Sequence, residues 1–125
     1  MILLLDSHAL VWWLLGGEKL SEPARRSIAD QANDTIVSAA TVWELAIKRA
    51  VGKLELAADI SSDVEAAGFH GLPITLADAE SAAALPRHHN DPFDRLLIAQ
   101  AQRVDAIVVT RDRAFGDYDV TVLPA

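Results

Sequence analysis

Residues 91–110, with the sequence DPFDRLLIAQAQRVDAIVVT, predict a helix that is followed almost at once by a buried strand. Asp91 before Pro92 is typical of a helix N-cap with proline at the first helical position, and apolar residues then recur at helical spacing as far as Arg103. The run Ala106–Thr110 is apolar on both faces. Such a strand belongs in a parallel sheet that is covered by helices on both sides.

Outside this stretch the chain alternates between short apolar runs and amphipathic segments. The other predicted strands are Ile2–Leu5, Thr35–Ser38, Leu72–Ile74 and Val120–Leu123. The predicted helices are Ser7–Leu15, Pro23–Gln31, Thr41–Val51, Ala58–Ala67, Ala77–Leu85 and Pro92–Arg103. This alternation indicates an α/β fold, a three-layer α/β/α sandwich with a central parallel sheet. A length of 125 residues predicts one domain over residues 1–125.

The composition excludes several classes of protein. The sequence has no cysteine, which excludes disulfides, thiolate metal sites and thiol catalysis. A net charge of −7 argues against a protein that coats nucleic acid through a broad basic surface. The apolar N-terminal segment lacks a basic region and is interrupted at Asp6, so it does not match a signal peptide, and no later run is long enough to span a bilayer. We therefore expect a soluble, cytoplasmic protein.

Four acidic residues from distant parts of the chain are predicted to meet at one edge of the sheet. Asp6 directly follows the first strand, and Asp112 lies two residues beyond the strand that ends at Thr110. Asp94 is in the first turn of the helix leading into that strand, and Glu44 is about one turn into the helix after the second strand. In parallel α/β sheets these positions all lie at the carboxyl edge, where ligands bind.

Two of these acids interrupt apolar helix faces. Asp94 shares a face with Leu97, Ile98 and Ala101, and Glu44 shares one with Ala40, Ile47 and Val51. A carboxylate on an apolar face is costly unless something compensates it.

Each acid also has a purely structural interpretation. Asp6 could cap the first helix, Asp112 could start a turn, and Glu44 could pair with Lys48 one turn on. A chance convergence of all four is much less probable. Several carboxylates held together require protons or a cation, and an all-oxygen site suits Mg²⁺ or Mn²⁺. Such ions activate water for hydrolysis of phosphodiesters.

Other chemistry finds less support in the sequence. Glycine-rich nucleotide loops and a nucleophile-elbow serine are absent, and His8 stands where a haloacid-dehalogenase-like phosphatase has its second aspartate. His88 and His89 lie in a loop, where a solvated pair is a more common finding than a proton-transfer or RNA-contact role. We interpret His8 and His70 as structural, and Trp12, Trp13 and Trp43 as core or interface residues. The basic residues that flank the edge and could bind phosphates are Lys48, Arg49, Arg87, Arg95, Arg111 and Arg113.

The segments LLLDSHALVWWL, SAATVWELAIK, DPFDRLLIAQA and VVTRDRAF, in this order and across almost the whole chain, resemble the PIN-domain ribonucleases, specifically the VapC-type toxins of bacterial toxin–antitoxin pairs. The resemblance implies the three-layer fold and a Mg²⁺- or Mn²⁺-dependent endoribonuclease that uses metal-activated water. It also implies RNA as substrate, a cognate antitoxin and a homodimer.

Carried over residue by residue, the resemblance gives a catalytic and metal-binding set of Asp6, Glu44, Asp94 and Asp112. Ser7 and Thr110 match hydroxyl positions that accompany the outer acids. Asp117 and Asp119 lie near Asp112 and are alternatives to it as the last acid. Two other functions stay open at this stage: a non-catalytic interaction module with the same fold, and a metal-dependent phosphatase or DNA nuclease.

Overall fold

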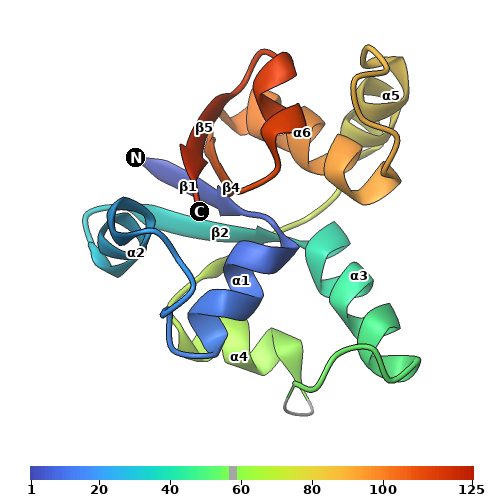
Figure 1. Cartoon of the computed structure of the whole chain (residues 1–125). Helices are drawn as coiled ribbons and strands as arrows, with labels where there is room; N and C mark the ends of the chain where they lie inside the picture. Colours follow the sequence, from blue (N-terminus) through green and yellow to red (C-terminus); the bar gives the residue numbers. More distant parts are fainter. Residues whose placement is uncertain (57–58) are drawn as a thin grey trace.

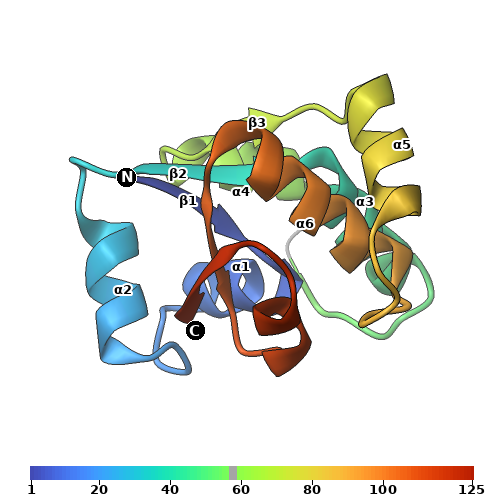
Figure 2. The ribbon, with the colours of Figure 1, turned by 90° about the horizontal axis from the view of Figure 1, so that it is seen from above.

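A five-stranded parallel sheet forms the centre of the computed structural model, which describes residues 1–56 and 59–125. The strands are β1 (Ile2–Leu5), β2 (Asp34–Ser38), β3 (His70–Leu72), β4 (Ile107–Thr110) and β5 (Thr121–Pro124). Their order in the sheet is β3-β2-β1-β4-β5, so the chain builds outward from β1 first in one direction and then in the other (Figures 1 and 2). Ligands of open α/β sheets bind where the order reverses in this way.

Helices cover both faces of this sheet, which confirms the three-layer prediction (Figures 1 and 2). The helices are α1 (Ser7–Leu14), α2 (Glu22–Ala29), α3 (Ala39–Ala50), α4 (Ile60–Ala66), α5 (Leu76–Ala84) and α6 (Pro92–Val104), and the 3₁₀ helix η1 spans Arg113–Asp117. Helices α1 to α4 pack on one face, where Leu3 and Leu5 lie, while α6 and η1 pack on the other, with Leu4. This burial on both faces explains the uninterrupted apolar sequence of β1.

Local sequence signals fix the start of α6. The Asp91 side chain accepts hydrogen bonds from the backbone N–H groups of Phe93 and Asp94, at 2.8 and 3.3 Å, and Pro92 occupies the first helical position. The helix ends at Val104, and its C-cap Asp105 adopts the left-handed conformation with φ of 55°. Asp91 is therefore the N-cap that its sequence context predicts.

One predicted strand is misplaced. The strand β3 is His70–Leu72 instead of Leu72–Ile74, and it pairs with β2 through His70, Gly71 and Leu72. Pro73 explains the difference, because proline has no backbone N–H to donate to a neighbouring strand. The Pro73 carbonyl oxygen instead accepts a bond from Gln100 of α6 at 3.2 Å.

Helix ends shift for identifiable reasons. Helix α3 begins two residues before the predicted Thr41 because the Ser38 hydroxyl accepts from the Ala40 N–H at 3.0 Å and caps it. Helix α2 ends at Ala29, two residues before Gln31, because Asp30 is extended. The predicted start of the fourth helix, Ala58, lies outside the described residues. The remaining bounds agree within one residue. Among residues 1–56 and 59–125, no helix combines the length and apolar character needed to cross a membrane.

Candidate metal centre

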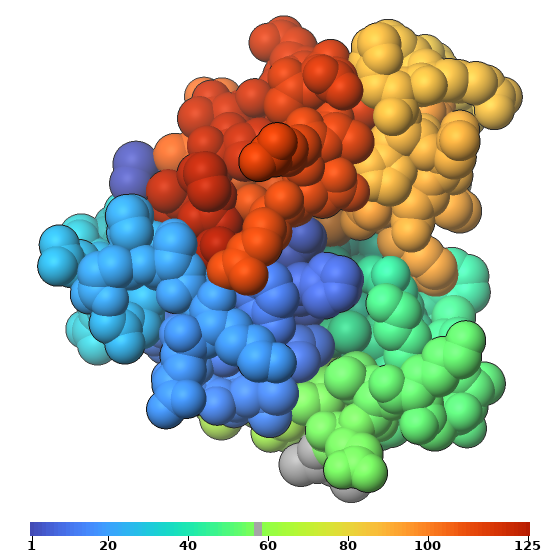
Figure 3. Space-filling model, viewed as in Figure 1, coloured from blue at the N-terminus to red at the C-terminus, as the bar shows by residue number. Residues whose placement is uncertain are grey.

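The four acids singled out from the sequence line one cavity of about 440 Å³ at the carboxyl edge of the sheet. Asp6 follows β1, Asp112 follows β4, Asp94 lies in the first turn of α6, and Glu44 lies on α3. In the space-filling view the blue atoms of α1, the green atoms of α3 and the orange and red atoms of the C-terminal third border a recess (Figure 3). Asp112, and not Asp117 or Asp119, lines this cavity.

Asp6 is buried at the junction of β1 and α1, with 4% of its surface exposed. Its Oδ1 accepts from the Ala9 N–H at 2.9 Å, so it is the N-cap of α1, and its Oδ2 accepts from the Thr110 hydroxyl at 2.6 Å. Burial raises the pKa of Asp6, while both hydrogen bonds oppose that rise. Asp6 therefore caps α1 and also lines the acidic cavity.

Thr110 connects two of the acids. Its hydroxyl donates to Asp6 and accepts the backbone N–H of Asp112 at 3.0 Å. Strands β1 and β4 are hydrogen-bonded neighbours in which Leu5 pairs with Val109, so these acids follow adjacent strand ends. Ser7, the other predicted hydroxyl, is buried and lines the same cavity.

Asp94 carries the largest electrostatic perturbation of the four. Burial is the main cause that raises the pKa of Asp94 to about 7, and the negative charges of Asp91, Glu44 and Asp6 add to it. His89 opposes the rise. The negative charge of this cluster is therefore not balanced by the side chains around it, as expected where a cation is to be bound.

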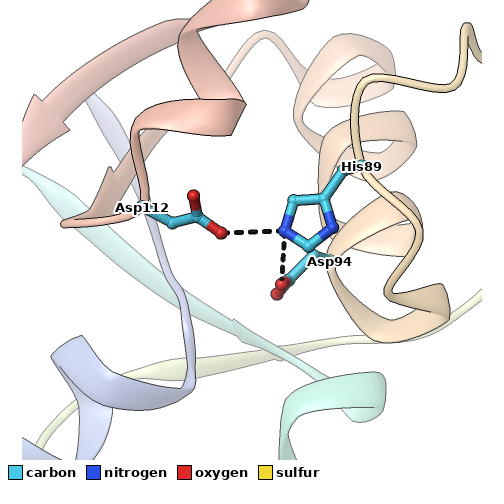
Figure 4. A group of neighbouring side chains, drawn as sticks. All are labelled: His89, Asp94 and Asp112. Carbon is cyan, nitrogen blue, oxygen red and sulfur yellow. Dashed lines mark hydrogen bonds and ion pairs between the residues drawn. The ribbon is translucent and has the colours of Figure 1, made fainter.

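His89 lies between Asp94 and Asp112 (Figure 4). Its Nε2 is 3.0 Å from Oδ2 of Asp94 and 2.8 Å from Oδ2 of Asp112. Partial burial by itself raises the pKa of Asp112, but bonds from the Ala114 N–H and from His89 outweigh it, so that pKa is lowered. Among the described residues, these three side chains form the group of potential ligands whose atoms lie within 4.8 Å of one another, and Asp6 and Glu44 are outside it.

The sequence analysis favoured a solvated loop pair for His88 and His89, and this is wrong for His89, whose side chain is 15% exposed and contacts two of the acids. A histidine in a loop carries no periodic signal that could have shown this. Its surroundings show that the loop is ordered by Arg95, whose guanidinium donates to the backbone oxygens of Ala82, Ala83, Leu85, Pro86 and His89. Arg95, one of the residues that could have bound phosphate, uses these donors within the fold and does not line the acidic cavity.

Glu44 is only partly on a buried face. Ala40 is buried, but Ile47 is 42% exposed and Val51 63% exposed, so the predicted apolar face of α3 does not enter the core over its second half. The alternative pairing with Lys48 is present, with Nζ 3.3 Å from Oε2. Glu44 nevertheless lines the acidic cavity together with Lys48.

The tryptophans divide into two groups. Trp12 and Trp13 pack against the core, as predicted, whereas Trp43 is 60% exposed and contacts Phe93 edge to face. Trp12 also stacks with His8 at 5.6 Å and lies 4.3 Å beneath the Arg111 guanidinium. His8, Trp12 and Arg111 line the acidic cavity, so of the predicted phosphate-binding residues Lys48 and Arg111 face it.

The donors in this cavity fit a hard divalent cation. The carboxylates of the four predicted acids offer oxygen ligands, and Asp91, the N-cap of α6, also lines the cavity. The raised pKa values of Asp6 and Asp94 indicate that the protein does not fully compensate their charge. Carboxylate oxygen is the ligand type that Mg²⁺ and Mn²⁺ prefer. The geometry thus suits metal-assisted chemistry on a phosphate group, with Lys48 and Arg111 beside it.

The chain is similar to known proteins along almost its whole length. A family model described as PIN domain matches residues 3–120. Ribonuclease VapC22 of Mycobacterium tuberculosis is 34% identical over 113 residues, which are 88% of this chain and 86% of that protein.

Solved structures share the fold at lower identity. VapBC2 from Rickettsia felis, bound to a DNA fragment from its promoter, has a TM-score of 0.72 at 16% identity and covers 98% of each chain. A toxin–antitoxin complex from Klebsiella pneumoniae has a TM-score of 0.67 at 18% identity, over 97% of this chain and 95% of the other. Chains with the same fold have thus been crystallised within toxin–antitoxin complexes.

Proposed function

This chain belongs to the PIN-domain family and is related to the VapC ribonucleases, and from that premise we propose that it is a Mg²⁺- or Mn²⁺-dependent endoribonuclease. The observation that carries the proposal is the convergence of Asp6, Glu44, Asp94 and Asp112 on one cavity, with the pKa of Asp94 raised to about 7. PIN ribonucleases typically depend on a metal, and an uncompensated carboxylate cluster is the site that such an ion requires.

In this proposal Asp6, Glu44, Asp94 and Asp112 hold the ion. When bound, Mg²⁺ or Mn²⁺ would polarise the phosphodiester and supply an activated water. Thr110 keeps the Asp6 carboxylate turned toward the cavity through its 2.6 Å bond, and Ser7 lies beside it at the cavity wall. Lys48 and Arg111 place positive charge next to the phosphate that enters.

The proposed partners follow from the relatives. We assign the chain as the toxin of a toxin–antitoxin pair, with a cognate antitoxin protein, a homodimeric state and a cytoplasmic location where RNA is available. The exposed apolar residues Trp43 and Ile47 on α3 and Val51 at its C-cap support a protein interface, since large apolar side chains gathered on one side of a helix are typical of such surfaces.

The complete acid set argues against one of the two alternatives, the non-catalytic interaction module. A non-catalytic interaction module gains nothing from four converging carboxylates whose repulsion costs stability. A phosphatase or DNA nuclease would use the same ion, so the distinction between these activities depends on the substrate.

The test is an assay of the purified protein on single-stranded and stem–loop RNA with Mg²⁺ or Mn²⁺. Internal cleavage that EDTA abolishes and added Mn²⁺ restores is expected. Parallel reactions with DNA of the same sequence and with a phosphate monoester identify the other two activities. Cleavage that persists in EDTA, or DNA cleaved in preference to RNA, would overturn the proposal.

A further inference from the structure

We propose that His89 is a positioning residue whose Nε2–H group holds the carboxylates of Asp94 and Asp112 together in the arrangement that binds the metal ion. The inference rests on the proposed function, because it assigns these two acids to the metal. It concerns a residue for which the sequence favoured a solvated position and which the family resemblance did not place in the site.

The hydrogen bonds of the ring identify His89 as a donor to these acids. Nδ1 accepts the backbone N–H of Asp91 at 3.1 Å, so the proton of a neutral ring resides on Nε2. Nε2 in turn faces Oδ2 of Asp112 at 2.8 Å and Oδ2 of Asp94 at 3.0 Å. Neither nitrogen offers a lone pair to a cation in this arrangement. His89 is thus a hydrogen-bond clamp on two ligands instead of a third ligand.

The ring is held in place from several sides. The backbone N–H of His89 donates to the Tyr118 hydroxyl at 2.8 Å, and its carbonyl oxygen accepts from Arg95 at 3.1 Å. The ring contacts Phe115 edge to face at 5.8 Å, and only 15% of the side chain is exposed. A side chain fixed in this way has a defined direction for its N–H group.

Asp112 gains most from the clamp. Its side chain is 43% exposed, and besides His89 it accepts a bond from the Ala114 N–H at 2.9 Å. Without the Nε2–H donor, repulsion from Asp94 would turn this carboxylate toward solvent. Each carboxylate oxygen keeps a further lone pair for a cation while it accepts from His89, so clamping and metal binding are compatible.

The clamp acts through the acids and not on the substrate. Its loss should therefore weaken the metal site directly. In other metal sites, groups that orient the ligands change metal affinity or activity by about 10- to 100-fold. We expect His89→Ala to weaken Mn²⁺ binding within that range, and to lower kcat for RNA cleavage at saturating RNA while KM for RNA is retained.

The test measures Mn²⁺ binding to the purified protein without RNA, by electron paramagnetic resonance or calorimetry, in wild type, His89→Ala, His89→Gln and His88→Ala. Glutamine places an amide N–H near the position of Nε2, so His89→Gln should recover most of the affinity. His88, which contacts Tyr118 at 5.1 Å from the neighbouring position, provides the matched control and should bind Mn²⁺ like wild type. Thermal unfolding checks that each variant folds. If His89→Ala does not fold, the Mn²⁺ affinity of His89→Gln is compared directly with that of wild type.

The outcomes separate the clamp from the proposed function. Weakened Mn²⁺ binding in His89→Ala with rescue by glutamine supports the clamp even if wild type fails to cut RNA, in which case only the ribonuclease assignment fails. Unchanged affinity in His89→Ala overturns the clamp, and tighter binding would show that His89 competes with the ion. Failure of a folded His89→Gln variant to recover affinity would show that a donor at this position is insufficient and overturn it as well.

Discussion

Asp78 and Asp94 occupy equivalent positions in neighbouring helices, but their surroundings have opposite effects. Each lies in the first turn, Asp78 in α5 and Asp94 in α6. Asp78 is 1% exposed and accepts from Arg103 at 2.6 and 3.0 Å and from the Thr75 N–H at 3.0 Å. Burial alone raises the pKa of Asp78, yet these bonds outweigh it and lower that pKa.

The Asp94 side chain is 17% exposed and that of Asp78 is 1% exposed, yet the pKa of Asp94 is raised to about 7. Burial is the main cause of this rise, and the surrounding acids add to it, while a single histidine donor does not outweigh it. A buried carboxylate that the fold compensates is part of the structure, whereas one left uncompensated points to a ligand from outside the protein. The contrast between the two aspartates therefore distinguishes a structural acid from a functional one.

The largest expected effect is on catalysis. Asp94→Asn removes a carboxylate that we propose binds the metal ion, and loss of one preorganised electrostatic group typically costs about 10²- to 10³-fold in rate. RNA cleavage by this variant should fall by at least that factor, while its melting temperature is retained or raised because repulsion is relieved. A folded Asp94→Asn variant with full activity would remove Asp94 from the proposed site.

Substitution of the structural acid, Asp78, should lower stability and leave RNA cleavage intact. Asp78→Ala removes charge-assisted hydrogen bonds and half of a capping box, which predicts a loss of about 3 kcal/mol in the free energy of unfolding. Urea unfolding measures this loss, and RNA cleavage should persist where the protein is folded. Glu80→Ala, an exposed acid on the same helix, is the control and should change little. Equal destabilisation by both substitutions would contradict the comparison.

Asp94 should also give the metal-free protein a characteristic pH dependence. Its folded-state pKa of about 7 exceeds the ordinary value of 3.8, so the folded protein binds this proton more tightly than the unfolded chain does. Stability in EDTA should therefore fall as pH rises between those values and level off above about 7. Between pH 5 and 7 wild type should lose on the order of 2 kcal/mol relative to Asp94→Asn. Parallel pH profiles of the two proteins would contradict the assignment, whereas saturating Mn²⁺ should suppress the loss.

The smallest effect is expected at Asp91. Asparagine caps helices about as well as aspartate, so Asp91→Asn should change the free energy of unfolding by less than about 0.5 kcal/mol and preserve RNA cleavage. Asp91→Ala loses the cap and should cost about 1 kcal/mol. Chemical denaturation of the two variants, with cleavage assays alongside, measures both effects. A severe loss of activity in Asp91→Asn would give Asp91 a role beyond the cap.

Much of the fold was predictable because the strands and helices with the clearest apolar pattern in the sequence also lie at the centre of the fold. The strand β1 was predicted with its observed bounds, and β4 and α6 within one residue. The edge strand β3 was not, because HGLPI contains little apolar pattern and its bounds depend on pairing with β2. Edge strands owe their position to tertiary contacts that no local window contains.

The site was predictable as far as it depends on topology. Asp6, Glu44, Asp94 and Asp112 reach one cavity because strand ends and helix starts share an edge of the sheet. The contacts of His89 and Arg95 were not predictable, since both depend on how the loop before α6 folds against α5 and η1. The exposure of Ile47 and Val51 also escaped prediction, because helical periodicity indicates an apolar face without indicating what covers it.

The sheet order has a consequence for when the protein becomes active during its synthesis. Strand β1 is made first, but its neighbour β4 and the acids Asp94 and Asp112 come from the second half of the chain. The bond between Asp6 and Thr110 joins positions 104 residues apart. A nascent chain on the ribosome therefore cannot assemble the four-acid cavity until Asp112 has emerged and β4 has paired with β1. The topology itself delays any cleavage of nearby RNA until residue 112 has left the ribosome.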